Sequence, residues 1–336
     1  MLKLDLQYNN VETLLNSCNI VGVDKLAFAM DKKDVPELKL KGTKSWIDEE
    51  TGEITYSRGS LFDIQIYSRS NYLVFEFNPA ILLFGNNFQT VTYKEFVEMI
   101  YDIEDKLGFS IQNAGVNKIH IQSTLTVDKK PQTYFNVLGN SPRHIRSLHK
   151  STLYYETGSR KQYKTNMFYD KKVQSRMKYL EGEYLRFECQ YYNEYLKYFA
   201  RKIGKNRITI KDLQNPEIYL LFVDLWCNEY LNIEKEKDRF FNLDLINTLT
   251  DIDKMLINKG LESLGGITGF EKQLNISKQF SDKKSDFFSK AKSRFRKISK
   301  LPSITTEGVL LSELNSKMEI AYQNTKISIT NTKSII

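Results

Sequence analysis

The sequence predicts an α+β fold in which helices pack on one face of a mostly antiparallel sheet. The first observation is the order of the predicted elements: two strands, a helix, a strand, a short helix, three strands and then helices. The second is strict alternation of apolar and polar residues in several of the strands, which is typical of a sheet with two different faces.

The first two strands are predicted at Leu61–Ser68 and Asn71–Asn78. They are separated by a short polar break, so we interpret them as a hairpin, and Pro79 ends the second strand. A helix follows, because Thr92 and Glu95 have the spacing of a capping box and Gly108 is a favourable C-terminal stop.

Residues 118–127 form the most regular predicted strand, with Ile119, Ile121, Leu125 and Val127 on one face and His120, Gln122, Thr124 and Thr126 on the other. Three further strands are predicted at 151–155, 165–171 and 184–192, and helices at 193–202 and 216–230.

The pattern changes after about residue 235. Helical apolar spacing covers 243–257, a glycine-rich stretch interrupts it, and a basic helix covers 285–301 before Pro302. In that helix Phe288, Phe295 and Ile298 are expected to be buried, and the polar end of the chain is predicted to be a late strand or a frayed tail. We therefore expect an α+β domain at 1–235 and a mainly helical DNA-binding or accessory region at 236–336.

Charge is concentrated in two segments. The 336 residues carry a formal net charge of +8, but 129–178 alone holds twelve Lys or Arg and two acids. A second basic segment, 281–300, holds eight Lys or Arg and two Asp. Such clustering favours two surfaces that face phosphate, although solvated faces would give the same pattern.

Composition also excludes several classes. With 41% hydrophobic residues, 16 Gly and 6 Pro, the chain is neither collagen-like nor wholly disordered. Three widely spaced cysteines argue against a disulfide framework or a zinc ribbon. No signal-peptide core and no apolar run of about 20 residues is evident. We expect a protein of the cell interior without a membrane partner.

A metal site is suggested by His120 and Gln122, whose side chains point the same way from one strand. A carboxylate from another strand would complete such a site, and the candidates are Glu76 and Glu188. An ion pair with Arg186 or with a group on a neighbouring strand is the structural alternative for Glu188.

Tyr169 lies within the first basic segment, in the sequence NMFYDKK. A hydroxyl beside several cations would have its phenolate form favoured, and a phenolate can attack phosphorus to form a phosphotyrosine. Most of the 20 tyrosines must nevertheless be packing residues.

Several stretches, in order, resemble the replication initiators of filamentous phages and small plasmids, the gene II/gene X class. These are VGVDKLAF, VFEFNPAILLFGNNF, NKIHIQSTLTVD, SRKQYKTNMFYDKKVQ, YLRFECQYYNEYLKYF and LLFVDLWCNEYL. They span about residues 20 to 235. The chain departs from the family at the metal-motif strand, where the family usually has Asp in place of His120, and the broader class has a second His in place of Gln122.

The resemblance implies that 1–235 has the fold of the nicking endonucleases with a His-hydrophobic-His metal motif. It also implies a rolling-circle initiator in a bacterial cytoplasm, which nicks one strand of an origin. Tyr169 would be the nucleophile, with Lys171 and Lys172 holding phosphate or stabilising the phenolate. Mg²⁺ or Mn²⁺ would be held by Glu76, His120 and Gln122, with Glu188 as a fourth ligand. The expected partners are single-stranded and duplex DNA and also a host helicase and polymerase.

DNA contacts are expected from both basic segments. From the first segment the candidates are Arg160, Lys161 and Lys164, with Tyr154 and Tyr155 as stacking platforms, and from the second they are Lys292, Arg294 and Arg296. Two other functions stay open: a non-catalytic, origin-binding regulator of replication, and a relaxase for plasmid transfer.

Overall fold

The computed structural model describes residues 18–47, 54–69, 71–158, 163–177, 179–236, 239–241, 248–278, 285–299, 305–307 and 309–333. The chain divides into two compact units, Met1–Glu236 together with Leu310–Ile336, and Lys237–Val309. The end of the chain thus groups with the first unit, whereas the sequence predicts one C-terminal region that includes all of 236–336.

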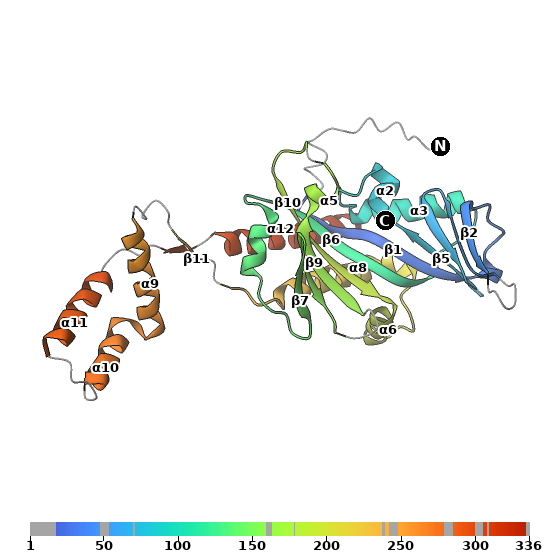
Figure 1. Cartoon of the computed structure of the whole chain (residues 1–336). Helices are drawn as coiled ribbons and strands as arrows, with labels where there is room; N and C mark the ends of the chain where they lie inside the picture. The colour runs from blue at the N-terminus through green and yellow to red at the C-terminus, as the bar shows by residue number, and fades with distance from the viewer. Residues whose placement is uncertain are drawn as a thin grey trace. The chain divides into compact units, whose positions relative to one another are not determined.

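The first unit is built on a 10-stranded sheet with the strand order β2-β3-β4-β5-β1-β6-β10-β9-β8-β7 (Figure 1). All neighbouring strands pair antiparallel. The strands are β1 (Val21–Asp31), β2 (Lys41–Ile47), β3 (Ile54–Leu61), β4 (Ile64–Ser68), β5 (Tyr72–Phe77), β6 (Gly115–Val127), β7 (Ile145–His149), β8 (Thr152–Glu156), β9 (Lys164–Asp170) and β10 (Glu183–Tyr192).

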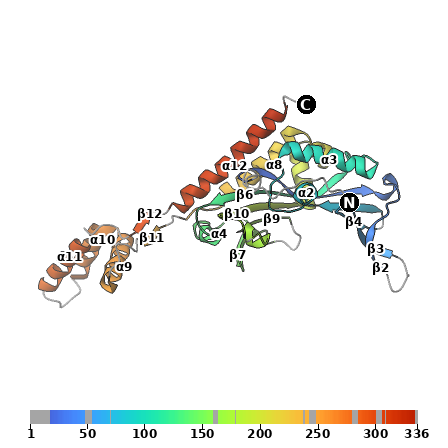
Figure 2. The same ribbon diagram turned by 90° about the horizontal axis from the view of Figure 1, so that it is seen from above.

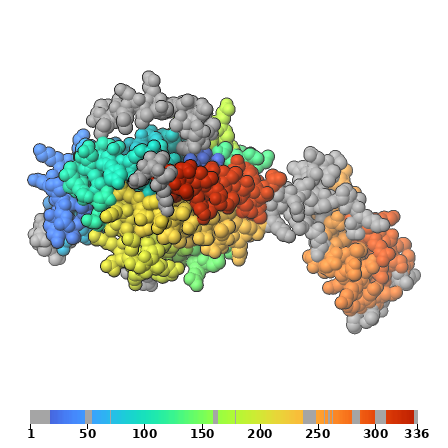
Figure 3. Space-filling model, turned by 180° about the vertical axis from the view of Figure 1, so that it is seen from behind, coloured from blue at the N-terminus to red at the C-terminus, as the bar shows by residue number. Residues whose placement is uncertain are grey.

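Long helices cover one face of this sheet. Figure 2 shows α3 (Tyr93–Leu107), α8 (Pro216–Leu231) and α12 (Leu310–Lys333) on the same side of the strands. Helix α6 (Asn193–Lys202) also packs there, since Tyr195 stacks on the buried Tyr191 of β10. Helix α12, red in the view from behind (Figure 3), contacts both α8 and α3. The predicted α+β class, a mostly antiparallel sheet with helices on one face, is confirmed.

Local sequence signals explain several boundaries. Thr92 and Glu95 form the predicted capping box at the start of α3, and Gly108 ends the helix with a φ of 75°. The strand predicted at 118–127 is extended at its start to Gly115, and its apolar face packs in the core.

The short elements are a 3-10 turn at Lys32–Asp34, α2 (Pro79–Phe84), α4 (Pro131–Tyr134), a 3-10 turn at Phe135–Val137, α5 (Lys171–Gln174) and α7 (Ile210–Leu213). Within the described ranges no helix combines the length and the apolar character needed to span a membrane.

Several regions differ from the sequence-based expectation: β7 was not predicted, for example, and the strand expected at 61–68 begins only at Ile64, after a turn at Phe62 and Asp63. Strands β2 and β3 were not predicted, because Lys41–Ile47 is exposed along its whole length and so lacks a buried alternating face. The polar end of the chain is neither a strand nor a frayed tail but the long helix α12. Leu314, Met318 and Ala321 are buried on one face of α12, and this packing overrides the β propensity of its later residues.

The second unit contains α9 (Leu249–Ser263), α10 (Gly266–Lys278) and α11 (Ser285–Ser299), with a small sheet of β11 (Arg239–Phe241) and β12 (Thr305–Glu307). The expected basic helix corresponds to α11, and its predicted end, including Pro302, lies outside the described residues. Phe288 and Ile298 are buried as predicted, and the Phe295 ring packs 4.3 Å from that of Phe270.

Candidate active site

The face of the sheet opposite the long helices carries a buried polar cluster at its centre. Strands β6 and β10 pair with Gln122 opposite Glu188 and His120 opposite Gln190. Tyr169 of β9 lies opposite Arg186, the residue two before Glu188. Because side chains two apart on a strand share a face, alternation along three adjacent strands brings these groups together.

Glu188 is the hub of this cluster. Its Oε1 lies 2.9 Å from His120 Nδ1 and accepts a hydrogen bond from Gln190 Nε2 at 2.8 Å. Its Oε2 accepts a hydrogen bond of 2.8 Å from the Tyr169 hydroxyl. Burial by itself raises the pKa of Glu188, but these hydrogen bonds and the nearby His120 outweigh it and hold the pKa below its usual range. Glu188 is therefore a carboxylate at neutral pH.

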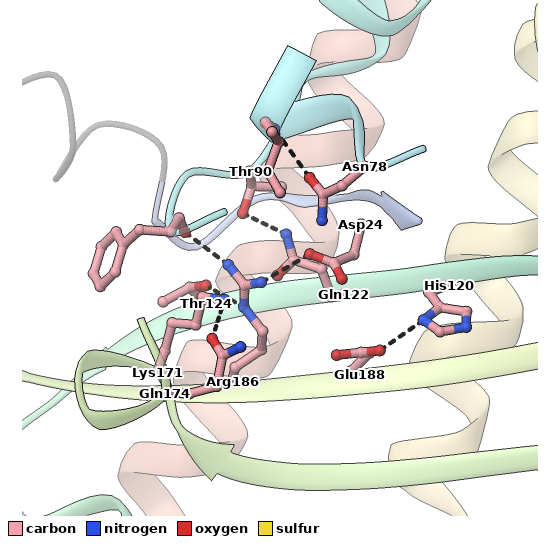
Figure 4. A network of polar contacts seen from close by, with 12 residues as sticks. Asp24, Asn78, Thr90, His120, Gln122, Thr124, Lys171, Gln174, Arg186 and Glu188 are labelled. Carbon is pink, nitrogen blue, oxygen red and sulfur yellow. Dashed lines mark hydrogen bonds and ion pairs between the residues drawn. The ribbon is translucent and has the colours of Figure 1, made fainter. Parts of the chain in front are cut away.

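Asp24 of β1 joins the cluster at an irregularity in the sheet. The pairing of β1 with β6 shifts between Val23 and Lys25, so Asp24 sits where the alternation breaks. One ligand atom from each of Asp24, His120 and Glu188 lies within 4.8 Å of the other two. Asp24 Oδ1 also accepts a hydrogen bond of 2.9 Å from Arg186 Nη1 (Figure 4).

Arg186 anchors the whole arrangement. Its side chain is fully buried, and it donates to Thr124 Oγ1, to Asp24 Oδ1 and to the carbonyl of Phe88. A buried guanidinium whose donors are satisfied can hold a carboxylate in a fixed position. Arg186 thus pairs with Asp24 and not with Glu188, which instead contacts His120 of the neighbouring strand β6.

The residues present fit a divalent metal. His120 Nε2 and Gln122 Oε1 are buried atoms without a hydrogen-bond partner in the described part of the chain. Gln122 Nε2 donates to Thr90 Oγ1 at 3.0 Å, which directs its carboxamide into the same cluster (Figure 4). Two carboxylates, one imidazole and a carboxamide oxygen form a mainly oxygen donor set, which suits Mg²⁺ or Mn²⁺.

Glu76, the acid expected to complete the metal site, lies outside this group. Its carboxylate pairs with Lys25 at 3.4 Å and with Lys118 at 2.5 Å. Burial alone would raise the pKa of Glu76, but the two lysines bring it below its ordinary value. Glu76 shares the wall of the site cavity, yet its charge is already neutralised.

Tyr169 lines a cavity of about 700 Å³ together with Asp24, His120 and Glu188. Its side chain is 8% exposed. Burial and the neighbouring Glu188 carboxylate raise the pKa of Tyr169 well above its ordinary value. This is opposite to the expectation that nearby cations favour the phenolate, because burial and Glu188 outweigh the charge of Arg186. Lys164 and Lys172 contact other groups.

Lys171, at the start of α5, lies in the same cavity and is 1% exposed. Its Nζ donates to Gln174 Oε1 at 2.7 Å and lies 5.9 Å from the centre of the Tyr169 ring. Burial, and then the charge of Arg186, lower the pKa of Lys171 to about 6. Lys172 instead points away and donates to the carbonyl of Gly182.

The DNA-binding candidates of the first basic segment are scattered. Tyr155 is fully buried and donates to the carbonyl of Gly139, so it cannot act as a stacking platform. Lys164 points to the helical face, where its Nζ contacts Glu229 Oε1 at 2.5 Å. Among the members of this group that the structure describes, Tyr154 alone lines the site cavity. Arg160 and Lys161 lie outside the described residues.

The candidates of the second basic segment all lie on α11. Arg294 is exposed, Lys292 donates to Asn275 Oδ1 at 2.7 Å, and Arg296 pairs with Glu271 at 2.5 Å. Both acceptors belong to α10. The three cations are thus kept on the surface of the helical unit.

Sequence reasoning missed Asp24 as a site residue. A signal was present: the apolar residues Val21, Val23, Leu26 and Phe28 are spaced by two, three and two, so the alternation slips next to Asp24. A slip of this kind is typical of a β-bulge, and bulges often re-aim side chains beside active sites.

Comparison with known proteins gives little beyond the structure. No family model and no curated protein matches the chain. A solved structure of a rolling circle replication initiator protein from Geobacillus stearothermophilus is similar with a TM-score of 0.33 and 14% identity, covering 63% of this chain and 85% of that one. Similarity at this level carries no functional argument.

Proposed function

We propose that this protein is a rolling-circle replication initiator that cuts one strand of DNA through Tyr169. The observation that carries the proposal is the chain of contacts from the Tyr169 hydroxyl to Glu188 and on to His120, with Asp24 close by, inside one cavity. A nucleophile, a hydrogen-bonded carboxylate and a group of metal donors are the parts that phosphodiester cleavage requires.

In the proposed step the Tyr169 oxygen attacks the scissile phosphorus while its proton passes to Glu188 Oε2. The bond from phosphorus to the 3′ oxygen breaks, and that oxygen takes up a proton to become a 3′ hydroxyl. The 5′ phosphate stays joined to Tyr169. Attack by a 3′ hydroxyl on the phosphotyrosine reverses the step and rejoins DNA.

A divalent cation held by Asp24, His120 and Glu188, with Gln122 as a further donor, would polarise the scissile phosphate and lower the pKa of Tyr169. Arg186 holds Asp24 in place, and Glu188 orients both His120 and Tyr169. Lys171, mostly uncharged when the cavity is empty, would gain a proton as a phosphate approaches.

The test uses labelled single-stranded oligonucleotides from the protein's own replicon, incubated with and without Mn²⁺. Wild-type protein should give a DNA adduct that survives denaturant, and Tyr169→Phe should give none while retaining DNA binding. Tyr179→Phe is the matched control, since Tyr179 is nearby in the chain but 65% exposed.

Three other outcomes would each contradict a part of the proposal. An adduct formed by Tyr169→Phe would show that a different residue is the nucleophile. Binding without any adduct by the wild type would favour the non-catalytic regulator. Cleavage unaffected by a chelator would remove the metal from the proposal.

A further inference from the structure

Three aromatic rings form a ladder across the outer strands of the sheet. Trp46 of β2 lies opposite Tyr56 of β3, with ring centres 4.8 Å apart. Tyr56 in turn stacks on Tyr67 of β4 at 6.2 Å, with the ring planes 22° apart. The ladder therefore crosses three strands in a continuous line.

Two arginines alternate with these rings. The Arg58 guanidinium lies 5.9 Å from the centre of the Trp46 ring, and that of Arg69 lies 5.8 Å from the centre of the Tyr56 ring. Arginine over an aromatic face is a favourable cation–π contact, and it leaves most guanidinium donors available. Lys44, opposite Arg58, adds a third cation to the same face.

Trp46, at the end of the ladder, is not part of the hydrophobic core. Trp46 is 46% exposed, and every residue of β2 is exposed. The other tryptophan of the chain, Trp226, is fully buried. A tryptophan that only stabilised the fold would be expected to be buried, as Trp226 is. The exposed indole of Trp46 therefore points to a binding role.

The ladder and the candidate active site share one face of the sheet. Tyr56, Tyr67, Arg69 and Tyr72 line a cavity of about 1250 Å³. Glu76 lines both this cavity and the one that contains Tyr169. Six strand spacings separate β9 from β3 in the sheet, which is about 29 Å at ~4.8 Å per strand.

We propose that this aromatic ladder, Trp46, Tyr56 and Tyr67, stacks on the bases of a single DNA strand that continues from the candidate active site. The inference rests on the proposed function, which supplies the strand. Exposed aromatic rings recognise bases without regard to sequence, and interleaved arginines attract the backbone. The cavity also contains Asp31, Asp34 and Glu194, so stacking rather than uniform positive charge carries the proposal.

The single exposed tryptophan provides a direct readout. Titration with a single-stranded oligonucleotide should quench Trp46 fluorescence, whereas the buried Trp226 should be unaffected. Trp46→Phe should remove the quench. Tyr56→Ala and Tyr67→Ala, measured by anisotropy of a labelled oligonucleotide, should each weaken binding roughly 5- to 150-fold, as expected when one base is no longer stacked.

Tyr101→Ala is the matched control, because Tyr101 is 58% exposed on α3, on the other side of the sheet. It should bind as the wild type does. Circular dichroism of each variant checks folding, and Tyr56→Phe, which keeps the ring, should restore binding. Failure of Tyr56→Phe to do so in a folded variant would overturn stacking.

Two outcomes separate this inference from the proposed function. Adduct formation at Tyr169 without any Trp46 quench, and with unchanged affinity in the alanine variants, would overturn the ladder alone. A quench without any adduct would support the ladder while the proposed nicking activity fails. An equal quench by fully duplex DNA, whose bases are already stacked on one another, would also overturn the ladder.

Discussion

The two basic segments of the chain resemble one another in the sequence, but the fold uses their cations in different ways. In the segment 129–178, Lys164 pairs with Glu229, a buried residue of α8. Arg146 donates to the carbonyls of Leu138 and Phe135. Lys171 is buried beside Tyr169. These three cations are therefore structural parts of the first unit, whereas Lys129, Lys130, Arg143, Lys150 and Arg176 of the same segment are exposed.

Among the described residues of the segment 281–300, the cations stay at the surface. The Lys290 side chain is 78% exposed and that of Arg296 is 61% exposed. The apolar residues Phe288 and Ile298 take the buried side of α11 instead. A helix separates charge from its apolar stripe, whereas a strand directs alternate residues to opposite faces. The largely buried Lys164 of β9 and the exposed cations of α11 illustrate this difference.

The first prediction tests whether Lys164 is a structural residue, and it concerns a large loss of stability on replacing this lysine. Lys164→Met leaves the carboxylate of Glu229, a residue only 5% exposed, with Asn166 Nδ2 as its remaining hydrogen-bond donor at 2.8 Å. Removing one partner of a buried ion pair typically costs about 3–5 kcal/mol. We therefore expect the free energy of unfolding to fall by about that amount in urea denaturation.

The double variant Lys164→Met/Glu229→Gln is the control for this prediction, since it removes the stranded charge as well as the lysine. It should recover part of the stability that the single variant lacks. Arg294→Gln on α11 should change stability little. If Lys164→Met unfolds at the same urea concentration as the wild type, the pair is not a structural element of the sheet.

A second effect on stability, of similar size but dependent on pH, is expected at Lys171. Its pKa is about 6 in the folded protein and near the ordinary value when unfolded, so between these values only the unfolded chain binds the proton. The resulting penalty is fully present below about pH 6 and declines as pH rises toward ~10.4, by at most ~1.4 kcal/mol per pH unit.

Lys171→Met removes this titration. The melting temperature of the variant should exceed that of the wild type most strongly near pH 6, and the difference should shrink at pH 9. Lys172→Met is the matched control, because Lys172 donates to a carbonyl near the surface. A difference that stays constant from pH 6 to pH 9 would show that Lys171 is charged in the folded protein.

Those elements whose signals are local could be predicted from the sequence. Thr92 and Glu95 define the start of α3 by hydrogen bonds within one turn, and the alternation at 118–127 defines the central strand β6. The exposed strand β2 depends on pairing with β3, and α12 depends on packing against α8 and β6, which are distant in the chain. No local pattern encodes such contacts.

The candidate site was predictable to a similar degree. His120 and Gln122 were found because they share the polar face of an alternating strand, and Glu188 because it stands on a polar strand face with Arg186 and Gln190. Tyr169 was found because its basic segment resembles the family segment that carries the nucleophile. Which acid joins them depends on sheet register. Glu76 meets Lys25 and Lys118, whereas the bulge beside Val23 brings Asp24 to His120 and Glu188.

The smallest expected effect concerns the exposed cations of α11. Neutralising Lys292, Arg294 and Arg296 together, each to Gln, should weaken binding of duplex origin DNA. The slope of log K against log[salt] should flatten by up to about 0.9 for each phosphate that the helix no longer neutralises. Cleavage of short single strands should change little, since the proposed site lies in the first unit.

A control with an equal reduction of charge distinguishes local binding from net charge. Lys94, Lys106 and Lys211 are exposed residues of the first unit, and Lys94 and Lys106 belong to α3 on the helical side of the sheet. Changing these three to Gln removes the same charge, so general attraction to DNA would fall equally in both triple variants. A flatter slope in the α11 variant alone assigns phosphate binding to that helix. Equal slopes in both variants would mean that α11 makes no specific contact with duplex DNA.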